Sequence, residues 1–435
     1  MHVAGYGDLY LVFLGKYVIP ILSLSVFLVG LTMMQPVFHS LRILLCLLVV
    51  LYVKSQEADK PYVVLLSLDG FRWDFPDMYS TPGLDAMARD GVKAKSLISS
   101  FPTKTFPNHY TIITGLYPDH HGIVSNRFVD PATGKTFALA NAEKTNPAYY
   151  GGTPFWVVAE EKGIRTASYN WPGSETVIGG RQPGIWKHYN ETIPLSQRID
   201  TIIQWLQLPY TSRPHFISVY FEQPDKVLHG FGPESPEAGA MIRMTDSLVG
   251  ILRTKLKMLP MADSINLLVV SDHGMTALSD QRNIVLEEHV PSHWLEYPVT
   301  GSPVVFLKAA PGYYDSMAAA IKRIPHVKGW VSGKMPKRLH FGKNERCLDF
   351  TLVADPGWTL ITSPGQKVEK GNHGYDNRLK DMHGIFYATG PAFRQNYISG
   401  SFQNIHIYEL LAHIYHIRIP ANDGSFRKVK QLLKK

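Results

Sequence analysis

The sequence TKTFPNHYTIITGLYPDHHGIVSN, residues 103–126, contains the feature around which the rest of the chain can be interpreted. Thr105 precedes Pro107 and an apolar periodic run, which predicts a helix that begins directly after Thr105 with proline in its first turn. Gly115 is expected to end this helix after about two turns. Free N–H groups and the positive dipole end at a helix N-terminus favour a bound phosphate. The Thr105 hydroxyl is therefore placed to attack such a group, and the amide of Asn126 can contact the same anion.

Three continuous apolar runs predict buried strands, and each run leads into acidic residues. They lie at Tyr62–Leu68, 215–221 and 265–271. Helical patterns lie between them, at Pro82–Asp90, 155–162, 195–207 and 237–257. This alternation predicts an α/β fold with a mostly parallel central sheet and helices on both faces. Ligands of such sheets bind beyond the carboxyl ends of the strands, so we expect the site there.

The folded part of the chain is expected to have three sections. Residues 60–275 are predicted to form the first part of a catalytic α/β core, 276–370 an inserted α+β subdomain, and 371–435 the last part of the core. The inserted subdomain has predicted strands at 302–307 and 352–362 and a helix at 314–324. A strand at 385–389 and a closing helix at 407–416 are predicted to follow.

Residues 1–59 are interpreted as a signal peptide or membrane-anchor region with a linker. The apolar run at 43–53, preceded by Arg42, has the length of a signal-peptide core, and the run at 17–34 is long enough to span a membrane. Translation from Met33 or Met34 would make the upstream residues an artefact of gene prediction. We therefore expect export to the periplasm or the cell surface, with membrane anchoring as the alternative.

The composition is that of a globular chain with a large core, since 45% of the 435 residues are hydrophobic and 18% are charged. The net charge of +8 suits an acidic substrate or an anionic membrane surface. The positive charges are scattered without a long Lys/Arg block, and we expect no binding to nucleic-acid polymers. Two cysteines, Cys46 and Cys347, exclude a disulfide framework.

Six potential metal ligands follow the predicted strands or lie between glycines: Asp69, Asp225, His229, Asp272, His273 and His373. Each alone has an ordinary explanation as a turn former, a cap or one of the 18 histidines. Together they supply carboxylates and imidazoles, a mixture that favours zinc over magnesium or calcium and leaves manganese or iron open. With Thr105 the set is too large for one tetrahedral site and suits two.

Two metals about 3.5 to 4 Å apart are the usual clamp for in-line displacement at phosphorus. Coordination to zinc lowers the pKa of a hydroxyl, which would activate Thr105 as a nucleophile without a general base. Thr105 alone would be read as an ordinary N-cap. The ligand set favours the catalytic interpretation instead.

Five segments resemble the nucleotide pyrophosphatase/phosphodiesterase family, a branch of the alkaline phosphatase superfamily. They are LLSLDGFRWDF, PTKTFPNHYTIITGLYPDHHGI, EQPDKVLHG, SDHGM and GNHGYDN, and the likeness runs from about residue 61 to 420. The resemblance implies two zinc ions, one held by Asp225, His229 and His373 and the other by Asp69, Thr105, Asp272 and His273. It also implies that Thr105 is the nucleophile and that its backbone N–H and the Asn126 side chain bind the non-bridging phosphate oxygens.

The same resemblance implies that Phe106, Tyr189 and Tyr220 surround the nucleoside of a substrate, although each also fits ordinary packing. The many cysteines and extra domains of animal secreted members are missing, so the chain resembles the compact bacterial-type enzymes. The implied activity is metal-dependent hydrolysis of phosphodiester or pyrophosphate bonds in small molecules. Nucleotides are the expected substrates, with release of nucleoside 5′-monophosphates through a phosphothreonine intermediate.

Other activities stay open at this point. Members of the family also cleave choline or lysophospholipid diesters. A phosphomonoesterase of the superfamily would recruit an arginine or a third metal; the neutral Asn126 favours a diester, while Arg72 and Lys104 keep the monoesterase open. A surface protein that binds ligands without catalysis is disfavoured because all seven ligands are present. Phosphoglycerate mutase-like chemistry is disfavoured by the export signal.

Overall fold

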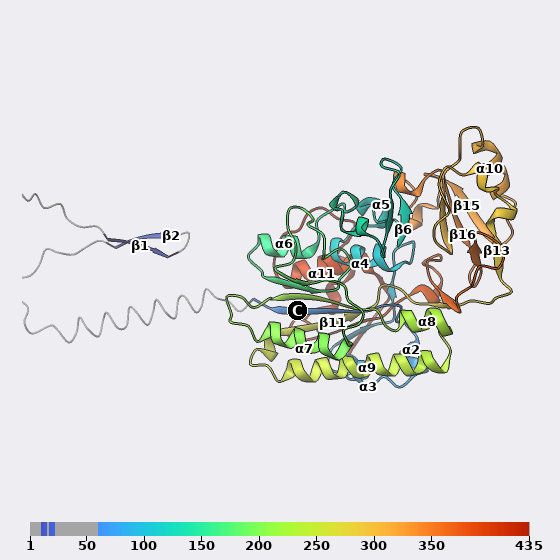
Figure 1. Cartoon of the computed structure of the whole chain (residues 1–435). Helices are drawn as coiled ribbons and strands as arrows, with labels where there is room; N and C mark the ends of the chain where they lie inside the picture. Colours follow the sequence, from blue (N-terminus) through green and yellow to red (C-terminus); the bar gives the residue numbers. More distant parts are fainter. Residues whose placement is uncertain (1–9, 15–16, 22–59, 435) are drawn as a thin grey trace, which may run out of the picture. The chain divides into compact units, whose positions relative to one another are not determined.

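The computed structural model describes residues 10–14, 17–21 and 60–434 (Figure 1). Met1–Asp59 and Lys60–Lys435 are two separate units. In the first, strand β1 (Tyr10–Leu14) pairs antiparallel with β2 (Tyr17–Ile21). Only residues 17–21 of the predicted membrane run are described, and the predicted signal-peptide core at 43–53 lies outside the described residues. Within the described ranges, no helix combines the length and the apolar character that a membrane crossing requires.

The second unit is built on a central sheet of eight strands in the order β20-β4-β19-β11-β3-β10-β8-β9. These strands are β3 (Tyr62–Leu68), β4 (Val92–Ala94), β8 (Thr166–Tyr169), β9 (Ile185–Lys187), β10 (Phe216–Phe221), β11 (Ile265–Val270), β19 (Phe386–Thr389) and β20 (Tyr397–Ser399). Strand β19 is antiparallel to β11 and β4. The other pairings are parallel, which confirms the predicted mostly parallel sheet.

Helices cover both faces of this sheet, as predicted (Figure 1). One face carries α3 (Pro82–Asp90), α7 (Leu195–Leu206) and α9 (Pro236–Lys257), and the other carries α4 (Thr105–Thr114), α6 (Phe155–Glu161) and α11 (Ile407–Ile414). In β3, Val64 and Leu66 belong to the hydrophobic core that includes residues of α7 and α9. Val63 and Leu65 belong to the core that includes residues of α4 and α6. Because alternate residues enter different cores, the strand is apolar at nearly every position; the exception is the buried Ser67.

Short elements that the sequence did not predict complete the unit. The helices are α2 (Phe75–Met78), α5 (Pro118–His121) and α8 (Asp225–Phe231). The paired short strands are β5 (Leu97–Ile98) with β21 (Phe402–Gln403), β6 (Arg127–Val129) with β7 (Thr136–Ala138), and β12 (Thr276–Ala277) with β18 (Gly371–Asn372).

Residues between 276 and 370 form a second sheet with a hydrophobic core of its own. Its strands are β14 (Val304–Leu307), β15 (Val327–Val331) and β16 (Phe350–Ala354), accompanied by helix α10 (Tyr314–Ile321). The predicted single strand at 352–362 is wrong. Strand β16 ends at Ala354, and β17 (Thr359–Ile361) pairs instead with β13 (Asn283–Val285). Gly357, with a φ of +76°, lies in the turn between them. The boundaries of the inserted subdomain stay a prediction.

Candidate active site

Helix α4 begins at Thr105, one residue earlier than predicted, with Lys104 as its N-cap residue. Pro107 lies in the first turn, and Gly115 ends the helix in the left-handed conformation with a φ of +69°. The N-cap side chain makes no capping hydrogen bond, and within the described residues the Thr105 hydroxyl bonds to no backbone N–H of the helix. Thr105 Oγ1 lies 3.2 Å from Nε2 of His273. Capping therefore does not explain this threonine.

The acidic residues come from the carboxyl ends of adjacent parallel strands. Asp69 follows β3, Asp272 follows β11, and Asp225 follows β10 at the start of α8. Because β3 lies between β10 and β11, the three strand ends meet at one edge of the sheet. There His273 Nε2 lies 3.4 Å from Asp69 Oδ1 and 3.0 Å from Asp272 Oδ2.

Gly70 makes the close approach of these strand ends possible. Its φ is +69°, and a Cβ at this position would lie 2.9 Å from the Cβ of Asp225. The Gly70 N–H donates to Asp272 Oδ1 at 3.2 Å. A side chain at residue 70 would therefore push the carboxylates of Asp69 and Asp225 apart.

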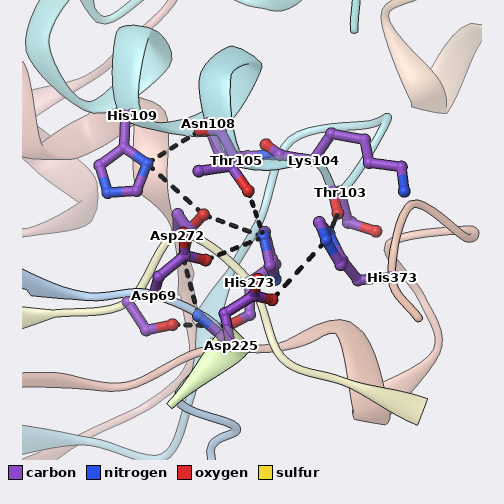
Figure 2. A network of polar contacts seen from close by, with 12 residues as sticks. Asp69, Thr103, Lys104, Thr105, Asn108, His109, Asp225, Asp272, His273 and His373 are labelled. Atoms are coloured by element: carbon purple, nitrogen blue, oxygen red, sulfur yellow. Dashed lines mark hydrogen bonds and ion pairs between the residues drawn. The ribbon is translucent and has the colours of Figure 1, made fainter. Parts of the chain in front are cut away.

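Helix α8 places Asp225 and His229 one turn apart, with Asp225 Oδ2 3.4 Å from His229 Nε2. His373 follows β18, and its Nε2 lies 3.7 Å from Asp225 Oδ1. The ring of His373 stacks on that of His273 with 3.5 Å between centroids. Figure 2 shows Asp225, His273 and His373 converging below Thr105.

Two groups of side chains could each hold a metal ion, Asp69 with Asp272 and His273, and Asp225 with His273 and His373. Within each group the donor atoms lie within 4.8 Å of one another. His273 belongs to both groups, whereas the predicted zinc ligation assigns it to one ion. The predicted ligation stays a prediction.

Both groups contain a buried carboxylate oxygen that has no hydrogen-bond partner among the described residues. These oxygens are Asp69 Oδ1, Asp272 Oδ2 and Asp225 Oδ1. An unpartnered buried acceptor is costly, and a cation between the carboxylates would remove the cost. The mixture of imidazole nitrogen and carboxylate oxygen suits zinc. The residues present therefore fit a metal centre.

The pKa values of the cluster reflect its burial and crowding. Burial, together with the charges of Asp272 and Asp225, raises the pKa of Asp69 well above its ordinary value. Burial also disfavours the Asp272 anion, but His273 and His109 outweigh this effect and lower its pKa. Burial lowers the pKa of His373, which keeps its imidazole neutral, the form that binds metals.

His109, which the sequence analysis missed, connects the nucleophile helix to the cluster (Figure 2). Its Nδ1 lies 2.8 Å from the Thr105 carbonyl oxygen and 3.4 Å from Asp272 Oδ2. Its Nε2 lies 2.8 Å from the Ser67 hydroxyl of β3. The signal that could have found it is its position four residues after Thr105, which places both on one side of the helix.

Asn126 lies beside the start of α4, as the prediction requires. Its Oδ1 accepts a hydrogen bond of 2.8 Å from the Phe106 N–H. This bond orients the amide group so that Nδ2 can donate to an anion. The Thr105 N–H has no acceptor within the described part of the chain, so it can serve the same anion.

A pocket adjoins Thr105 and contains all three predicted aromatic residues. It is lined by Thr105, Phe106, Leu139, Lys144, Thr145, Asn170, Trp171, Pro172, Gly173, Glu175, Thr176, Tyr189 and Tyr220. Tyr189 lies at the rim, 40% exposed, whereas Tyr220 is 8% exposed and donates from its hydroxyl to Asp69 Oδ2 at 2.6 Å. The sequence analysis missed Trp171 and Glu175 because it did not predict the short strand β8 that precedes them.

The two cations that kept a phosphomonoesterase open have protein partners. Arg72 Nε donates to Asp74 at 2.6 Å and its Nη1 to the Met275 carbonyl at 3.1 Å. Lys104 Nζ donates to Asn372 Oδ1 at 3.1 Å.

The fold defines an α/β protein of the alkaline phosphatase type, with its polar cluster at the carboxyl ends of the central strands. A model of the type I phosphodiesterase / nucleotide pyrophosphatase family matches residues 63–376. The chain belongs to this family, as predicted.

Several curated relatives align with most of the chain. Rat ectonucleotide pyrophosphatase/phosphodiesterase family member 3 is 36% identical over 387 residues, which cover 86% of this chain and 44% of that protein. Human family member 1 is 35% identical over 390 residues, covering 86% of this chain and 42% of that protein. Venom phosphodiesterase of Naja atra is 34% identical over 387 residues, covering 86% and 47%. This chain thus spans less than half the length of these relatives.

A solved structure covers the same region. Murine ectonucleotide pyrophosphatase/phosphodiesterase 5 matches with a TM-score of 0.83 and 34% identity over 86% of this chain and 100% of that chain. An inactive threonine-to-alanine variant of that protein, in complex with AMP, matches over the same shares with a TM-score of 0.83 and 33% identity. The predicted fold is confirmed. The relatives named here are vertebrate proteins, and the likeness to compact bacterial-type enzymes stays a prediction.

Proposed function

We propose that this chain is a zinc-dependent phosphodiesterase that cleaves small nucleotides and releases nucleoside 5′-monophosphates. The observation that carries the proposal is the position of Thr105. This residue lines the aromatic pocket and also lies 3.2 Å from His273 of the carboxylate and imidazole cluster. A substrate with its base in the pocket would present a phosphorus atom to the Thr105 hydroxyl.

Two zinc ions would be held at the cluster, one by Asp225, His229 and His373 and one by Asp69, Thr105, Asp272 and His273. When bound, they would supply a lowered pKa for the Thr105 hydroxyl and positive charge for the phosphate and the leaving oxygen. The unpartnered buried oxygens of the three aspartates support this assignment.

The side chains of the protein would carry the remaining steps. Thr105 Oγ1 loses its proton and forms a bond to phosphorus as the bond to the leaving oxygen breaks, and the leaving group departs with a proton. The product is a phosphothreonine that still carries the nucleoside. Water then attacks phosphorus, the bond to Thr105 Oγ1 breaks, the threonine hydroxyl regains a proton and the nucleoside 5′-monophosphate is released. The Thr105 N–H and the Asn126 amide donate to the non-bridging oxygens throughout, with Asn126 held by the Phe106 N–H.

The pocket supports a nucleotide as substrate. Phe106, Tyr189 and Tyr220 would contact the base, and stacking on an aromatic side chain contributes about 1 to 3 kcal/mol per base. The AMP complex of the inactive murine variant supports the same choice by similarity. A phosphomonoesterase is less well supported, because Arg72 is held by Asp74 and the Met275 carbonyl.

We also propose that the protein is exported. Its relatives include an ectonucleotide pyrophosphatase/phosphodiesterase and a venom phosphodiesterase, names that denote enzymes outside the cell. The apolar run at 43–53 also predicts a signal peptide. Periplasmic, cell-surface and membrane-anchored forms are the alternatives.

Three substrates compared under identical conditions test the proposed activity: para-nitrophenyl thymidine monophosphate, para-nitrophenyl phosphate and a choline phosphodiester. We expect the nucleotide to be preferred. Thr105→Ala should lower activity by at least ~100-fold because covalent catalysis is lost, and Thr105→Ser should retain part of it. The metal content of Thr105→Ala, which should stay largely unchanged, is the control. Preference for either of the other substrates would overturn the nucleotide assignment.

A further inference from the structure

Arg346 reaches from the inserted region into the catalytic core. It lies in the short 3₁₀ turn Glu345–Cys347 and is only 9% exposed. Its Nη1 donates to the carbonyl oxygens of Gly122 and Tyr149, both at 2.9 Å, and its Nη2 to that of Ala148 at 3.1 Å. The guanidinium therefore joins the end of α5 to a segment that lies well beyond it in the chain.

Charge and aromatic contacts complete the environment of this guanidinium. Asp130 Oδ2 lies 3.4 Å from Nη2, and the rings of Tyr149 and Phe128 lie 5.0 and 5.7 Å from the guanidinium carbon. Three carbonyl acceptors, a carboxylate and two aromatic faces match the planar N–H fork of arginine, which lysine cannot reproduce. The contacts thus depend on arginine specifically.

The loop that carries Arg346 is itself anchored to α5. The backbone N–H groups of Gly342, Lys343 and Asn344 donate to the Asp119 carboxylate at 3.0, 3.0 and 2.9 Å. Helix α5 follows the nucleophile helix α4 in the chain, and Figure 1 shows α5 and β6 on the side of the core next to the inserted sheet. These hydrogen bonds therefore fix the loop that carries Arg346 to helix α5.

An aromatic chain links Arg346 to the substrate pocket. Phe128, under the guanidinium, stacks on Phe137 with 4.8 Å between ring centroids. Phe137 packs edge-on against Phe106 at 5.5 Å, and Tyr149 packs against Phe137 at 5.2 Å. Residues 128–149, which include Phe128, Phe137 and Tyr149, also carry Leu139, Lys144 and Thr145 of the pocket wall.

We propose that Arg346 is a positioning residue for substrate binding. Through it, the inserted region holds residues 128–149, which carry the aromatic chain and the pocket wall, against Phe106 of α4 and sets the affinity for the nucleoside part of the substrate. This inference rests on the proposed nucleotide phosphodiesterase function. Arg346 is not among the residues that line the pocket or the metal groups, so its loss should act on the pocket wall and spare the chemistry at phosphorus.

Kinetics of full-length, metal-loaded Arg346→Ala and Arg346→Lys test the proposal. We expect KM for para-nitrophenyl thymidine monophosphate to rise about 10-fold in Arg346→Ala, because three hydrogen bonds are lost and part of their free energy is transmitted to the pocket wall. Arg346→Lys should show a smaller rise, since it keeps the charge and loses the fork. Bis-para-nitrophenyl phosphate, which has no base, should change less than about 2-fold in kcat/KM. Arg323→Ala, at an exposed arginine of the inserted region, is the matched control and should behave as wild type.

Binding of AMP by calorimetry gives a readout that needs no turnover, and it should weaken by the same factor as KM rises. Equal losses on both substrates would mean that Arg346 acts only through stability, and unchanged KM and AMP affinity would mean that it does not position the wall; either result overturns the proposal. If Arg346→Ala does not fold, Arg346→Lys decides between the same outcomes. A wild-type enzyme that hydrolyses neither substrate would refute the proposed function, which is a separate failure.

Discussion

Replacing Tyr220 with phenylalanine should separate two roles that one side chain combines. The Tyr220 ring lines the pocket, and its hydroxyl donates to Asp69 Oδ2 at 2.6 Å. Tyr220→Phe keeps the ring and removes only the hydroxyl. The surface offered to a base is then preserved while Asp69, a proposed metal ligand, loses a buried hydrogen bond.

The size of the effect follows from that one bond. A hydrogen bond to a charged group contributes about 1.5 to 3 kcal/mol, and about 1.4 kcal/mol corresponds to a tenfold change. We therefore expect kcat on a nucleotide substrate to fall roughly 10- to 150-fold, with KM changed less than about 3-fold. Tyr220→Ala should show the same loss in kcat and, in addition, a raised KM for nucleotides because the stacking surface is gone.

The same bond should shift the pH dependence. Burial and the charges of Asp272 and Asp225 raise the pKa of Asp69, and the Tyr220 hydroxyl lowers it. Removing the hydroxyl raises the pKa further, so the carboxylate takes up a proton at a higher pH. Protonation competes with metal binding. As the pH is lowered, Tyr220→Phe should therefore lose metal and activity earlier than the wild type.

Steady-state kinetics across a pH series, with elemental analysis of the same samples, measure both effects. Tyr189→Phe is the matched control: it removes a tyrosine hydroxyl from a ring 6.4 Å from that of Tyr220, and no hydrogen bond joins it to Asp69 in the described structure. The reasoning is refuted if Tyr220→Phe has the kcat of the wild type and loses activity at the same acidic pH as the wild type.

Two further predictions concern the metal and the base. A chelator should abolish activity and zinc should restore it. Asp272→Ala should lower the activity by orders of magnitude. Fewer than one metal ion per chain in active enzyme would contradict the two-metal proposal. Phe106→Ala should raise KM for nucleotides by roughly 5- to 150-fold and affect bis-para-nitrophenyl phosphate far less. Equal losses on the two substrates would show that Phe106, which packs against Phe137 at 5.5 Å, is structural only.

Local patterns in the sequence were enough to predict the three strands that lead into Asp69, Asp225 and Asp272. Strand β3 was predicted with its observed bounds, and β10 and β11 to within one residue at each end. A strand covered on both faces is apolar at most positions, and this pattern is visible without knowledge of its neighbours. The acidic residues after these strands were likewise visible, because in such sheets a ligand site lies beyond the strand ends.

The wrong prediction of one strand at 352–362 overlooked a local signal, because Asp355-Pro356-Gly357 marks a turn between β16 and β17. Other elements could not be predicted because their signal is weak or not local. Strands β8 and β9 have only 4 and 3 residues, too short for a periodic pattern. The antiparallel direction of β19 depends on which strands it lies between, which its own residues do not record.

By itself, the sequence determined the α/β class, the family, the nucleophile candidate and the residue types available as metal ligands, since each can be recognised from residues within short segments. Only the tertiary structure decided which residues touch. The Tyr220 hydroxyl bonds to Asp69, which is 151 positions away in the sequence, and Arg346 bonds to Gly122, which is 224 positions away. The physical reason is that periodicity reports how deeply a position is buried, whereas its partner is selected by packing and hydrogen bonding summed over the whole fold.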